Sequence, residues 1–412
     1  MPKLLVIMLD GISADSFARR RGYMPHLSAL ARRGLVVENL EAEVCGTSFP
    51  GRTSIATGAL ASDSGIYGNV IWDGEQFRHA TPDDVRVPTL PALAQAAGKQ
   101  SAVVGYGMIR PEDTDLFKAP WWAGAFIQRS RDTVPVPTAQ SWRRAAEHIE
   151  ARLEAAAHQT GIELPLLPDL GDKYAKSALG DAQIMGLAGA VLLAEQPDLM
   201  FTEVLLPDTA QHYAGYDTPE ALWSLGYSDA LVGQLLARLE GAGLLEQYTI
   251  AVLSDHGHSR IDQALHPEVI IPQTTFACEG SMLHVVPKNA AELTEIRARL
   301  AEYGVEEYSN AHVPAEQREQ VYCFVAPDLY DFEYDPARPA SEAVGEPILR
   351  SSHGIRPGLP GDHRFMVLAG AEVSPRVVGR AAANQVAPTL ASALGISNKG
   401  FAGESLLEAV LG

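Results

Sequence analysis

The sequence has little cysteine and no long apolar run. Its three cysteines, Cys45, Cys278 and Cys323, share no short spacing. Such a pattern predicts neither a disulfide framework nor a thiolate metal site, and it fits a reducing compartment. The six-residue apolar run before Asp10 is too short for the core of a secretion signal, and no uninterrupted apolar span is long enough to cross a bilayer. We therefore expect a cytoplasmic protein without a membrane partner.

Basic residues are also scarce. The chain has 32 Lys and Arg against 51 Asp and Glu, a net charge of −19, and no basic run offsets this excess. A nucleic-acid polymer is therefore not an expected partner. A small anionic substrate remains compatible with this charge if bound metal ions make the local field positive. The composition predicts no particular oligomeric state, and its 46% apolar content is that of an ordinary globular protein.

Apolar runs alternate along the chain with helical patterns. Residues 4–9 are continuously apolar, as in a parallel strand buried on both faces. Further strands are predicted at 35–40, 101–104, 199–206, 248–253 and 365–368, and helices at 24–33, 89–97, 181–195, 218–241 and 386–394. This alternation predicts an α/β fold with a doubly wound, mostly parallel central sheet flanked by helices.

The alternation stops in one long segment. From residue 259 to 351 the chain has scattered prolines and short mixed patterns, and the strand and helix rhythm returns after His353. We interpret residues 259–351 as an inserted, smaller α+β cap subdomain. The catalytic core would then consist of residues 1–258 and 352–412.

Residues 45–58 form a turn rich in small and hydroxyl-bearing residues that leads into a helix. Thr47 and Ser48 precede Pro50 and Gly51, and both hydroxyls are equally plausible nucleophiles on this pattern alone. The start of a helix favours negative charge, which suits attack on an anion. An ordinary helix-capping loop is the alternative reading.

Three aspartates follow predicted strands. Asp10, Asp208 and Asp255 each lie at or just beyond a strand end, and ligands of open α/β sheets bind at the carboxyl edge of the strands. Asp208 and His212 are four residues apart, so a short helix would place both on one face.

Histidines accompany these aspartates. Asp255 and His256 are adjacent, an arrangement that suits metal binding only if the backbone turns sharply, as Gly257 would permit. His353 lies where the core pattern resumes. Aspartate and neutral histidine are the ligands expected for zinc, or for manganese if the site is richer in oxygen.

Several of these segments together are similar to those of a known family. They are Asp10-Gly11, Ser48-Phe49-Pro50, Gly65-Ile66 with Gly68-Asn69, Pro207-Asp208 with His212 and Gly215, Ser254-Asp255-His256-Gly257, His353-Gly354 and Ala387-Pro388-Thr389-Leu390. In this order the chain resembles the type I phosphodiesterase/nucleotide pyrophosphatase branch of the alkaline phosphatase superfamily. The resemblance covers about residues 1–75, 195–260 and 350–400 and is weak in between.

The resemblance implies two zinc ions per chain, with manganese as the alternative for one or both. One zinc would be held by Asp208, His212 and His353, and the other by Asp10, Asp255, His256 and the nucleophile Ser48. It further implies that Asn69, with a backbone N–H near Ser48, donates to a non-bridging oxygen of the substrate. The implied activity is hydrolysis of small-molecule phosphodiesters through a phosphoseryl intermediate on Ser48.

Aromatic residues are the implied substrate contacts. Phe49 follows the nucleophile as in family members that stack a nucleobase, and Trp121-Trp122 is similar to another stretch of the family. Packing in the core is the alternative for all three rings. His258 stands where Met is frequent in the family, and it is not predicted to be a ligand.

The chain departs from the family pattern beside the nucleophile. Ser48 replaces the usual Thr, and Gly51-Arg52 stands where Asn-His is common. The run Ser48 to Arg52 also fits a sulfatase pattern, although the histidine-rich ligand set suits two zinc ions better than the calcium of sulfatases. We expect Arg52 to pair with a surface carboxylate. The alternatives to a phosphodiesterase are a phosphonoacetate-type hydrolase, a phosphomonoesterase, a sulfatase and a non-catalytic metal-binding protein of the same fold.

Overall fold

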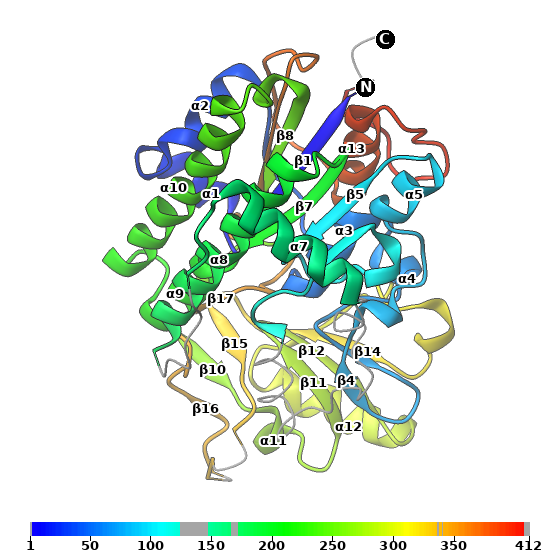
Figure 1. Ribbon diagram of the computed structural model, residues 1–412. Coiled ribbons are helices and arrows are strands. Elements are labelled where there is room, and N and C mark those ends of the chain that lie inside the picture. Colours follow the sequence, from blue (N-terminus) through cyan, green and yellow to red (C-terminus); the bar gives the residue numbers. More distant parts are fainter. Residues whose placement is uncertain (1, 124–146, 166–171, 336–337, 340, 408–412) are drawn as a thin grey trace.

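A computed structural model describes residues 2–123, 147–165, 172–335, 338–339 and 341–407 (Figure 1). An eight-stranded sheet lies at its centre, with the strand order β19-β2-β18-β8-β1-β7-β5-β6. In chain order these strands are β1 (Lys3–Leu9), β2 (Leu35–Leu40), β5 (Ser101–Val104), β6 (Leu116–Lys118), β7 (Leu199–Val204), β8 (Tyr248–Leu253), β18 (Arg364–Ala369) and β19 (Arg376–Val378). The strands predicted at 35–40, 101–104 and 248–253 have exactly these bounds.

The sheet is mostly parallel, as predicted. β1 lies between β7 and β8, and Leu5 pairs in register with Met200 on one side and Ile250 on the other. Only β18 runs antiparallel to its neighbours β8 and β2. The carboxyl ends of β1, β7 and β8 therefore meet at one edge of the sheet.

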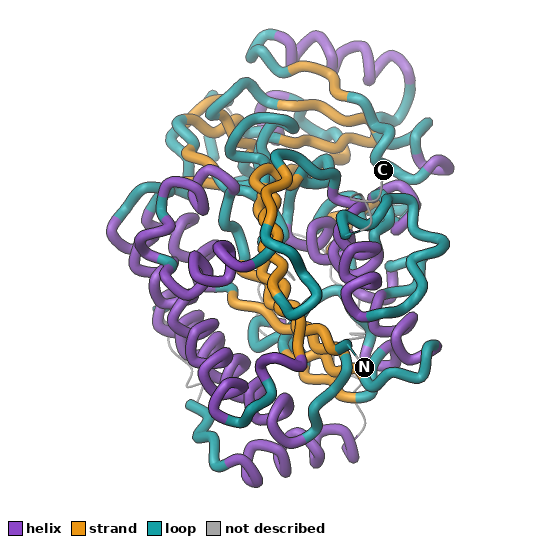
Figure 2. Tube along the Cα trace, turned by 90° about the horizontal axis from the view of Figure 1, so that it is seen from above, coloured by secondary structure: helices purple, strands orange, loops and turns teal. Residues whose placement is uncertain are grey.

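Helices cover both faces of the sheet (Figure 2). Leu4, Val6 and Met8 of β1 pack in one apolar core with α3, α5 and α13. Leu5, Ile7 and Leu9 pack in a second core with α2, α8 and α10. Outside residues 259–351 the described part of the chain contains the helices α1 (Ala14–Arg19), α2 (Pro25–Arg33), α3 (Ser48–Thr57), α4 (Ala61–Ser64), α5 (Leu90–Ala96), α7 (Glu147–Thr160), α8 (Lys173–Ala194), α9 (Leu206–Ala214), α10 (Pro219–Gly241) and α13 (Val386–Leu394). Burial on both faces explains why β1 is apolar at every position.

Residues 259–351 form separate small sheets below the central sheet in the view of Figure 1. A four-stranded sheet has the order β11-β12-β14-β13, and a three-stranded sheet has the order β15-β10-β16. The elements are β9 (Ser259–Arg260), β10 (Gln263–Leu265), α11 (Pro267–Ile270), β11 (Thr275–Glu279), β12 (Met282–Val286), α12 (Ala290–Ala301), β13 (Glu306–Tyr308), β14 (Tyr322–Val325), β15 (Tyr330–Phe332), β16 (Val344–Gly345) and β17 (Ser351–Ser352). A hairpin of β3 (Val70–Trp72) and β4 (Phe77–His79) belongs to the core part of the chain.

Two elements that carry site residues differ from the predicted bounds. α8 begins at Lys173 instead of residue 181, because the Asp172 side chain accepts a hydrogen bond from the Ala175 N–H and caps the helix there. β7 ends at Val204, and α9 then begins at Leu206 with Pro207 in its first turn. Asp208 therefore lies on a helix, four residues before His212.

α8 is also apolar enough to meet a membrane-span criterion. Among the described residues it is the one helix that does so, with a mean hydropathy of 1.4 over its most apolar window, and 72% of that window is buried. It contacts α7, α9, α10 and the strands β5 and β7. These contacts indicate that α8 packs as a core helix.

Candidate metal and catalytic site

The site lies at the carboxyl edge of the central strands. Asp10 follows β1, and Gly11, with φ of +71°, turns the chain away after it. Asp255 and His256 follow β8 next to it. Ser48 is the first residue of α3, and Asp208 and His212 lie on α9. The topology thus brings together residues from five separate segments. The fifth contributes His353, which follows β17.

Gly257 serves a different purpose from the predicted one. Its φ is not positive, so the backbone does not need glycine for a turn there. A Cβ atom at this position would instead lie 1.9 Å from the Gly361 carbonyl oxygen. The chain does bend at Asp255 and His256, as expected for metal binding by adjacent residues, and Gly257 permits the close approach of another backbone segment.

Asp10, Asp255 and His256 form one buried group. His256 Nε2 lies 3.1 Å from Asp10 Oδ1 and 3.7 Å from Asp255 Oδ2. The Ser48 hydroxyl lies 3.2 Å from the same nitrogen. His256 Nδ1 donates to the Gly257 carbonyl at 2.8 Å, which directs Nε2 toward the carboxylates and Ser48.

A second group is centred on Asp208. Its Oδ1 atom lies 3.2 Å from His212 Nε2 and 3.6 Å from His353 Nε2. His212 Nδ1 donates to the Ser351 carbonyl at 2.9 Å, so its Nε2 also faces Asp208. The rings of His256 and His353 are 4.0 Å apart between centroids, so the two groups adjoin.

Both groups have the chemistry of metal sites. Asp10 Oδ1 and Asp208 Oδ1 are buried and lack hydrogen-bond partners within the described part of the chain, and Asp255 Oδ2 lies 3.1 Å from Arg52 Nη1. Unpartnered buried carboxylate oxygens are costly, and a cation would satisfy them. Aspartate oxygens with imidazole nitrogens are the donor set of zinc or manganese. The residues present therefore fit the metal ions that the family resemblance implies.

Charge coupling sets the protonation states in the site. Burial and the adjacent Asp10 charge raise the pKa of Asp255 to about 6. Burial disfavours a charged His256 ring, but Asp255 and Asp10 outweigh it and raise the pKa of His256 to about 9. Burial lowers the pKa of His258 to about 4, so this ring is neutral near pH 7 and has a free lone pair.

Arg52 lies inside the site. Its side chain is 1% exposed and contacts Asp10 at 2.5 Å, Glu203 at 2.9 Å and Asp255 at 3.1 Å. The predicted pairing with a surface carboxylate is therefore wrong. Arg52 follows Ser48 by one turn of α3, and this spacing directs its guanidinium to the edge of the sheet, where the three acidic residues converge.

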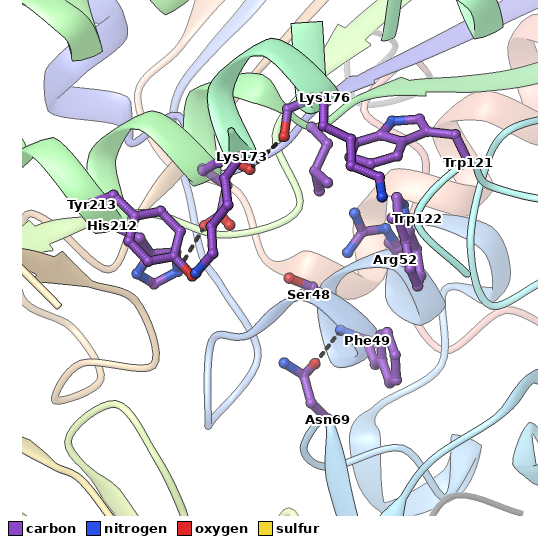
Figure 3. A pocket seen from close by; sticks show the side chains of 14 residues that line it. Ser48, Phe49, Arg52, Asn69, Trp121, Trp122, Lys173, Lys176, His212 and Tyr213 are labelled. Atoms are coloured by element: carbon purple, nitrogen blue, oxygen red, sulfur yellow. Dashed lines mark hydrogen bonds and ion pairs between the residues drawn. The ribbon is translucent and has the colours of Figure 1, made fainter. Parts of the chain in front are cut away.

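Ser48 opens onto a pocket with about 250 Å³ of space, shown in Figure 3. Asn69 Oδ1 accepts a hydrogen bond from the Phe49 N–H at 2.7 Å. This contact uses the backbone N–H next to Ser48, and it leaves Asn69 Nδ2 as the donor for a ligand. The Asn69 N–H itself donates to Glu279 Oε2 at 2.8 Å, so residue 279 of β11 supports the loop.

The predicted aromatic residues line the same pocket. Phe49 and Trp122 stack with ring centroids 6.2 Å apart and are only 3% and 8% exposed, so each offers a ring edge at most. Trp122 Nε1 donates to Glu203 at 2.5 Å. Trp121 is more exposed, and its Nε1 donates to Asp181 at 3.0 Å. Trp121 is therefore the ring best placed to stack on a ligand.

Several residues of the pocket wall were not predicted from the sequence, among them two lysines and a tyrosine. Lys173 and Lys176 of α8 and Tyr213 of α9 line it, and the Lys173 ammonium lies 3.7 Å from the Tyr213 ring centroid (Figure 3). The lysines were missed because the helix was expected to begin at residue 181. Their spacing of three residues is the signal that a correct helix start would have given, because it places both on one face.

Comparison with known proteins is consistent with this geometry. The family model described as Type I phosphodiesterase / nucleotide pyrophosphatase matches residues 4–345. The chain belongs to this family. The resemblance seen in the sequence is therefore confirmed.

Curated relatives are about a quarter identical to the chain over the aligned residues. Bis(5'-adenosyl)-triphosphatase ENPP4 of Homo sapiens is 24% identical over 64% of this chain and 49% of the relative. The Pongo abelii protein is 22% identical over 90% of this chain and 72% of the relative. Human N-sulphoglucosamine sulphohydrolase is 25% identical over 61% of this chain and 50% of the relative. The chain thus spans about half the length of the two human relatives.

A solved structure shares the fold across the whole chain. An inactive variant of murine ectonucleotide pyrophosphatase / phosphodiesterase 5 in complex with AMP matches with a TM-score of 0.70 and 16% sequence identity. The match covers 98% of both chains. This likeness confirms the predicted alkaline-phosphatase-like fold.

Proposed function

We propose that the protein is a two-metal phosphohydrolase that cleaves small-molecule phosphodiesters, as a nucleotide pyrophosphatase/phosphodiesterase does, with Ser48 as nucleophile. The supporting observation is that the Ser48 hydroxyl lies at the start of α3, 3.2 Å from His256 Nε2, beside two groups of aspartate and histidine ligands. Family membership and the fold shared with an AMP-binding relative support the substrate class.

The two ligand groups would hold two zinc ions, with manganese as the alternative. Asp208 would hold one ion with His212 and His353, whose Nε2 atoms lie 3.2 and 3.6 Å from its Oδ1. Asp10, Asp255, His256 and Ser48 would hold the other. Bound metals of this kind supply positive charge for the transition state and lower the pKa of a coordinated hydroxyl. The 3.2 Å between Ser48 Oγ and His256 Nε2 suits two atoms that bind one ion.

In the first chemical step the Ser48 hydroxyl loses its proton to solvent, and its oxygen forms a bond to phosphorus. The bond from phosphorus to the leaving oxygen breaks, and the leaving group takes the electron pair and then a proton. Asn69 Nδ2 donates to a non-bridging oxygen, because Asn69 Oδ1 is already bound to the Phe49 N–H. Water then breaks the bond between Ser48 and phosphorus, which regenerates the hydroxyl and releases the monoester.

The charges around the pocket favour an anionic ligand despite the acidic chain. Arg52 is fixed beside Asp10 and Asp255 and neutralises part of their charge. Lys173 and Lys176 add positive charge at the pocket wall. A substrate with a second phosphate or another anionic group would meet these lysines, which supports a nucleotide or pyrophosphate compound.

A sulfatase is the second candidate function because Arg52 lies in the site. The spacing of Ser48, Pro50 and Arg52 fits the sulfatase pattern, and the buried position of Arg52 makes that pattern more than a coincidence of surface residues. The histidines of both ligand groups argue against it, since calcium prefers oxygen ligands.

A substrate panel on zinc-loaded protein distinguishes these functions. We expect aryl and nucleotide phosphodiesters to be turned over faster than phosphomonoesters, phosphonoacetate or sulfate esters. Activity lost to a chelator should return with zinc and not with calcium. Preferred turnover of sulfate esters, or restoration by calcium, would contradict the proposed function. Preference for monoesters or phosphonoacetate would keep the metal core and assign one of the two related activities.

A further inference from the structure

The imidazole of His258 is buried next to the site but has no part in the proposed function. The residue is fully buried, and neither ring nitrogen has a hydrogen-bond partner within the described part of the chain. A buried polar ring without any partner is rare and costs free energy. The burial of this ring is explained if one or both of its nitrogens bind a ligand.

The position of His258 Nε2 matches that of the ligands already assigned. It lies 3.6 Å from Asp208 Oδ1, the same distance as His353 Nε2, while His212 Nε2 lies at 3.2 Å. Ligand atoms about 2.0 Å from a tetrahedral zinc ion are separated by about 3.3 Å. At 3.6 Å the contact with Asp208 is too long for a good hydrogen bond, so a direct bond to the carboxylate does not account for it.

The ring of His258 is held by packing. It lies nearly parallel to the Tyr216 ring, at 18° and 6.4 Å between centroids, and its centroid is 4.8 Å from that of His212. The backbone before it is fixed because Gly257 packs against the Gly361 carbonyl. Nε2 is therefore directed at Asp208 before any ion binds.

We propose that His258 Nε2 is a fourth protein ligand of the metal ion held by Asp208, His212 and His353. This inference rests on the proposed function for the other three ligands. Catalytic zinc sites usually have three protein ligands and one open position, whereas sites with four protein ligands are closed and bind their metal tightly. The Asp208 site is thus expected to select a tetrahedral ion such as zinc.

The two metal sites should then differ in affinity. The Asp208 site would have one carboxylate and three imidazoles, and among the described residues no Lys or Arg forms an ion pair with Asp208, whereas the Asp10 site has Arg52 in contact with both of its carboxylates. A fixed positive charge opposes the binding of a cation. We expect graded chelation to remove the ion at the Asp10 site first and to leave one zinc per chain.

The test measures bound metal, not turnover. Zinc is determined by elemental analysis after dialysis against graded chelator, for the wild type, His258→Leu and His258→Ala. The wild type should retain one zinc per chain at a chelator concentration at which both variants retain none. In both variants the zinc affinity of the Asp208 site should fall by more than roughly 10–100-fold. That range is the cost of losing a residue that only orients a metal ligand. Equal zinc retention and affinity in wild type and variants would overturn the proposal.

A matched control separates coordination from the loss of a buried ring. His266 is also fully buried, with one ring nitrogen unpartnered, but it lies between β10 and α11. His266→Leu should retain zinc as the wild type does. If His266→Leu lost as much zinc as His258→Leu, the loss of any buried imidazole ring would be enough to release the metal, and the proposal would be overturned.

A measurement on the wild type keeps the proposal testable if the variants do not fold. X-ray absorption at the zinc edge of protein with one retained zinc should show three imidazole ligands. Two imidazoles would overturn the assignment of His258. Failure of this inference leaves the turnover assays of the proposed function unaffected, whereas a catalytically active Ser48→Ala protein with a normal zinc site would contradict only the proposed function.

Discussion

The Arg52 guanidinium lies 2.5 Å from the Asp10 carboxylate, and both side chains are buried. The same guanidinium contacts Glu203 and Asp255, so one positive charge compensates the negative charge of three carboxylates. Without this residue the edge of the sheet would carry uncompensated buried negative charge. Arg52 is therefore central both to stability and to the electrostatics of the site.

Replacing Arg52 by Gln should destabilise the metal-free protein by about 3–5 kcal/mol, because a buried charge cluster loses its partner. Urea unfolding in the presence of chelator measures this change. Added zinc should recover part of the loss, since the metal would compensate the same carboxylates. Arg260→Gln is the control, because the exposed pair of Arg260 and Asp262 contributes about 0–1 kcal/mol. An equal effect of the two substitutions would contradict this account.

Asn69→Asp separates the two contacts of Asn69. The carboxylate can still accept the Phe49 N–H, but it has no N–H to donate to the substrate. We expect kcat to fall by about 10²–10³-fold, as on removal of an oxyanion donor, with little change in the thermal unfolding midpoint. Full activity of this variant would show that Asn69 does not touch the transition state.

The Lys173→Met substitution should lower kcat/KM more for a substrate with a second anionic group than for one without it. We expect kcat/KM for a dinucleoside polyphosphate to fall by about tenfold relative to an aryl phosphodiester, because one charge-assisted hydrogen bond to the second anionic group is lost. Steady-state kinetics on both substrates measures the ratio. Lys288→Met, at an exposed position away from the pocket, should leave the ratio unchanged. A parallel loss on both substrates would refute a role in selecting anionic groups.

Glu279 should make stability depend on pH. Burial raises the pKa of Glu279 from 4.5 to about 7, so the folded protein binds a proton that the unfolded chain releases. The free energy of unfolding should therefore fall as pH rises from about 4.5 to 7, by about 3 kcal/mol for this group. Urea unfolding of Glu279→Gln between pH 5 and 8 should show a shallower fall than the wild type. Glu319→Gln, at an exposed position, should match the wild type, and identical pH profiles for all three proteins would rule the effect out.

The central fold was predictable because its strands are buried on both faces. β5 and β8 have the predicted bounds, since an apolar run ends where the chain leaves the sheet, and β2 also has its predicted bounds although Glu38 and Asn39 within it are exposed. The start of α8 was not predictable from apolar spacing, because its first turns contain Lys173, Tyr174 and Lys176 and depend on the Asp172 cap. Local patterns thus define buried elements better than partly exposed ones.

The site residues that could be predicted from the sequence are those that belong to a recognisable motif. Asp10, Asp255 and His256 follow strands that lie side by side, and the structure brings them together. Arg52 was misplaced because its three partners come from distant segments, and no local pattern shows that the guanidinium is buried. His258 was passed over for the same reason, since burial and the distance to Asp208 depend on tertiary packing.

Trapping the reaction intermediate tests the central claim most directly. Acid quenching during turnover of a phosphodiester, followed by mass spectrometry of peptides, should find Ser48 carrying a phosphoryl group that retains one ester of the substrate. Ser48→Ala should show no adduct and no turnover, whereas Thr47→Val, which removes the neighbouring hydroxyl, should keep both. Turnover by Ser48→Ala at the wild-type rate, or an adduct on Thr47, would contradict the account.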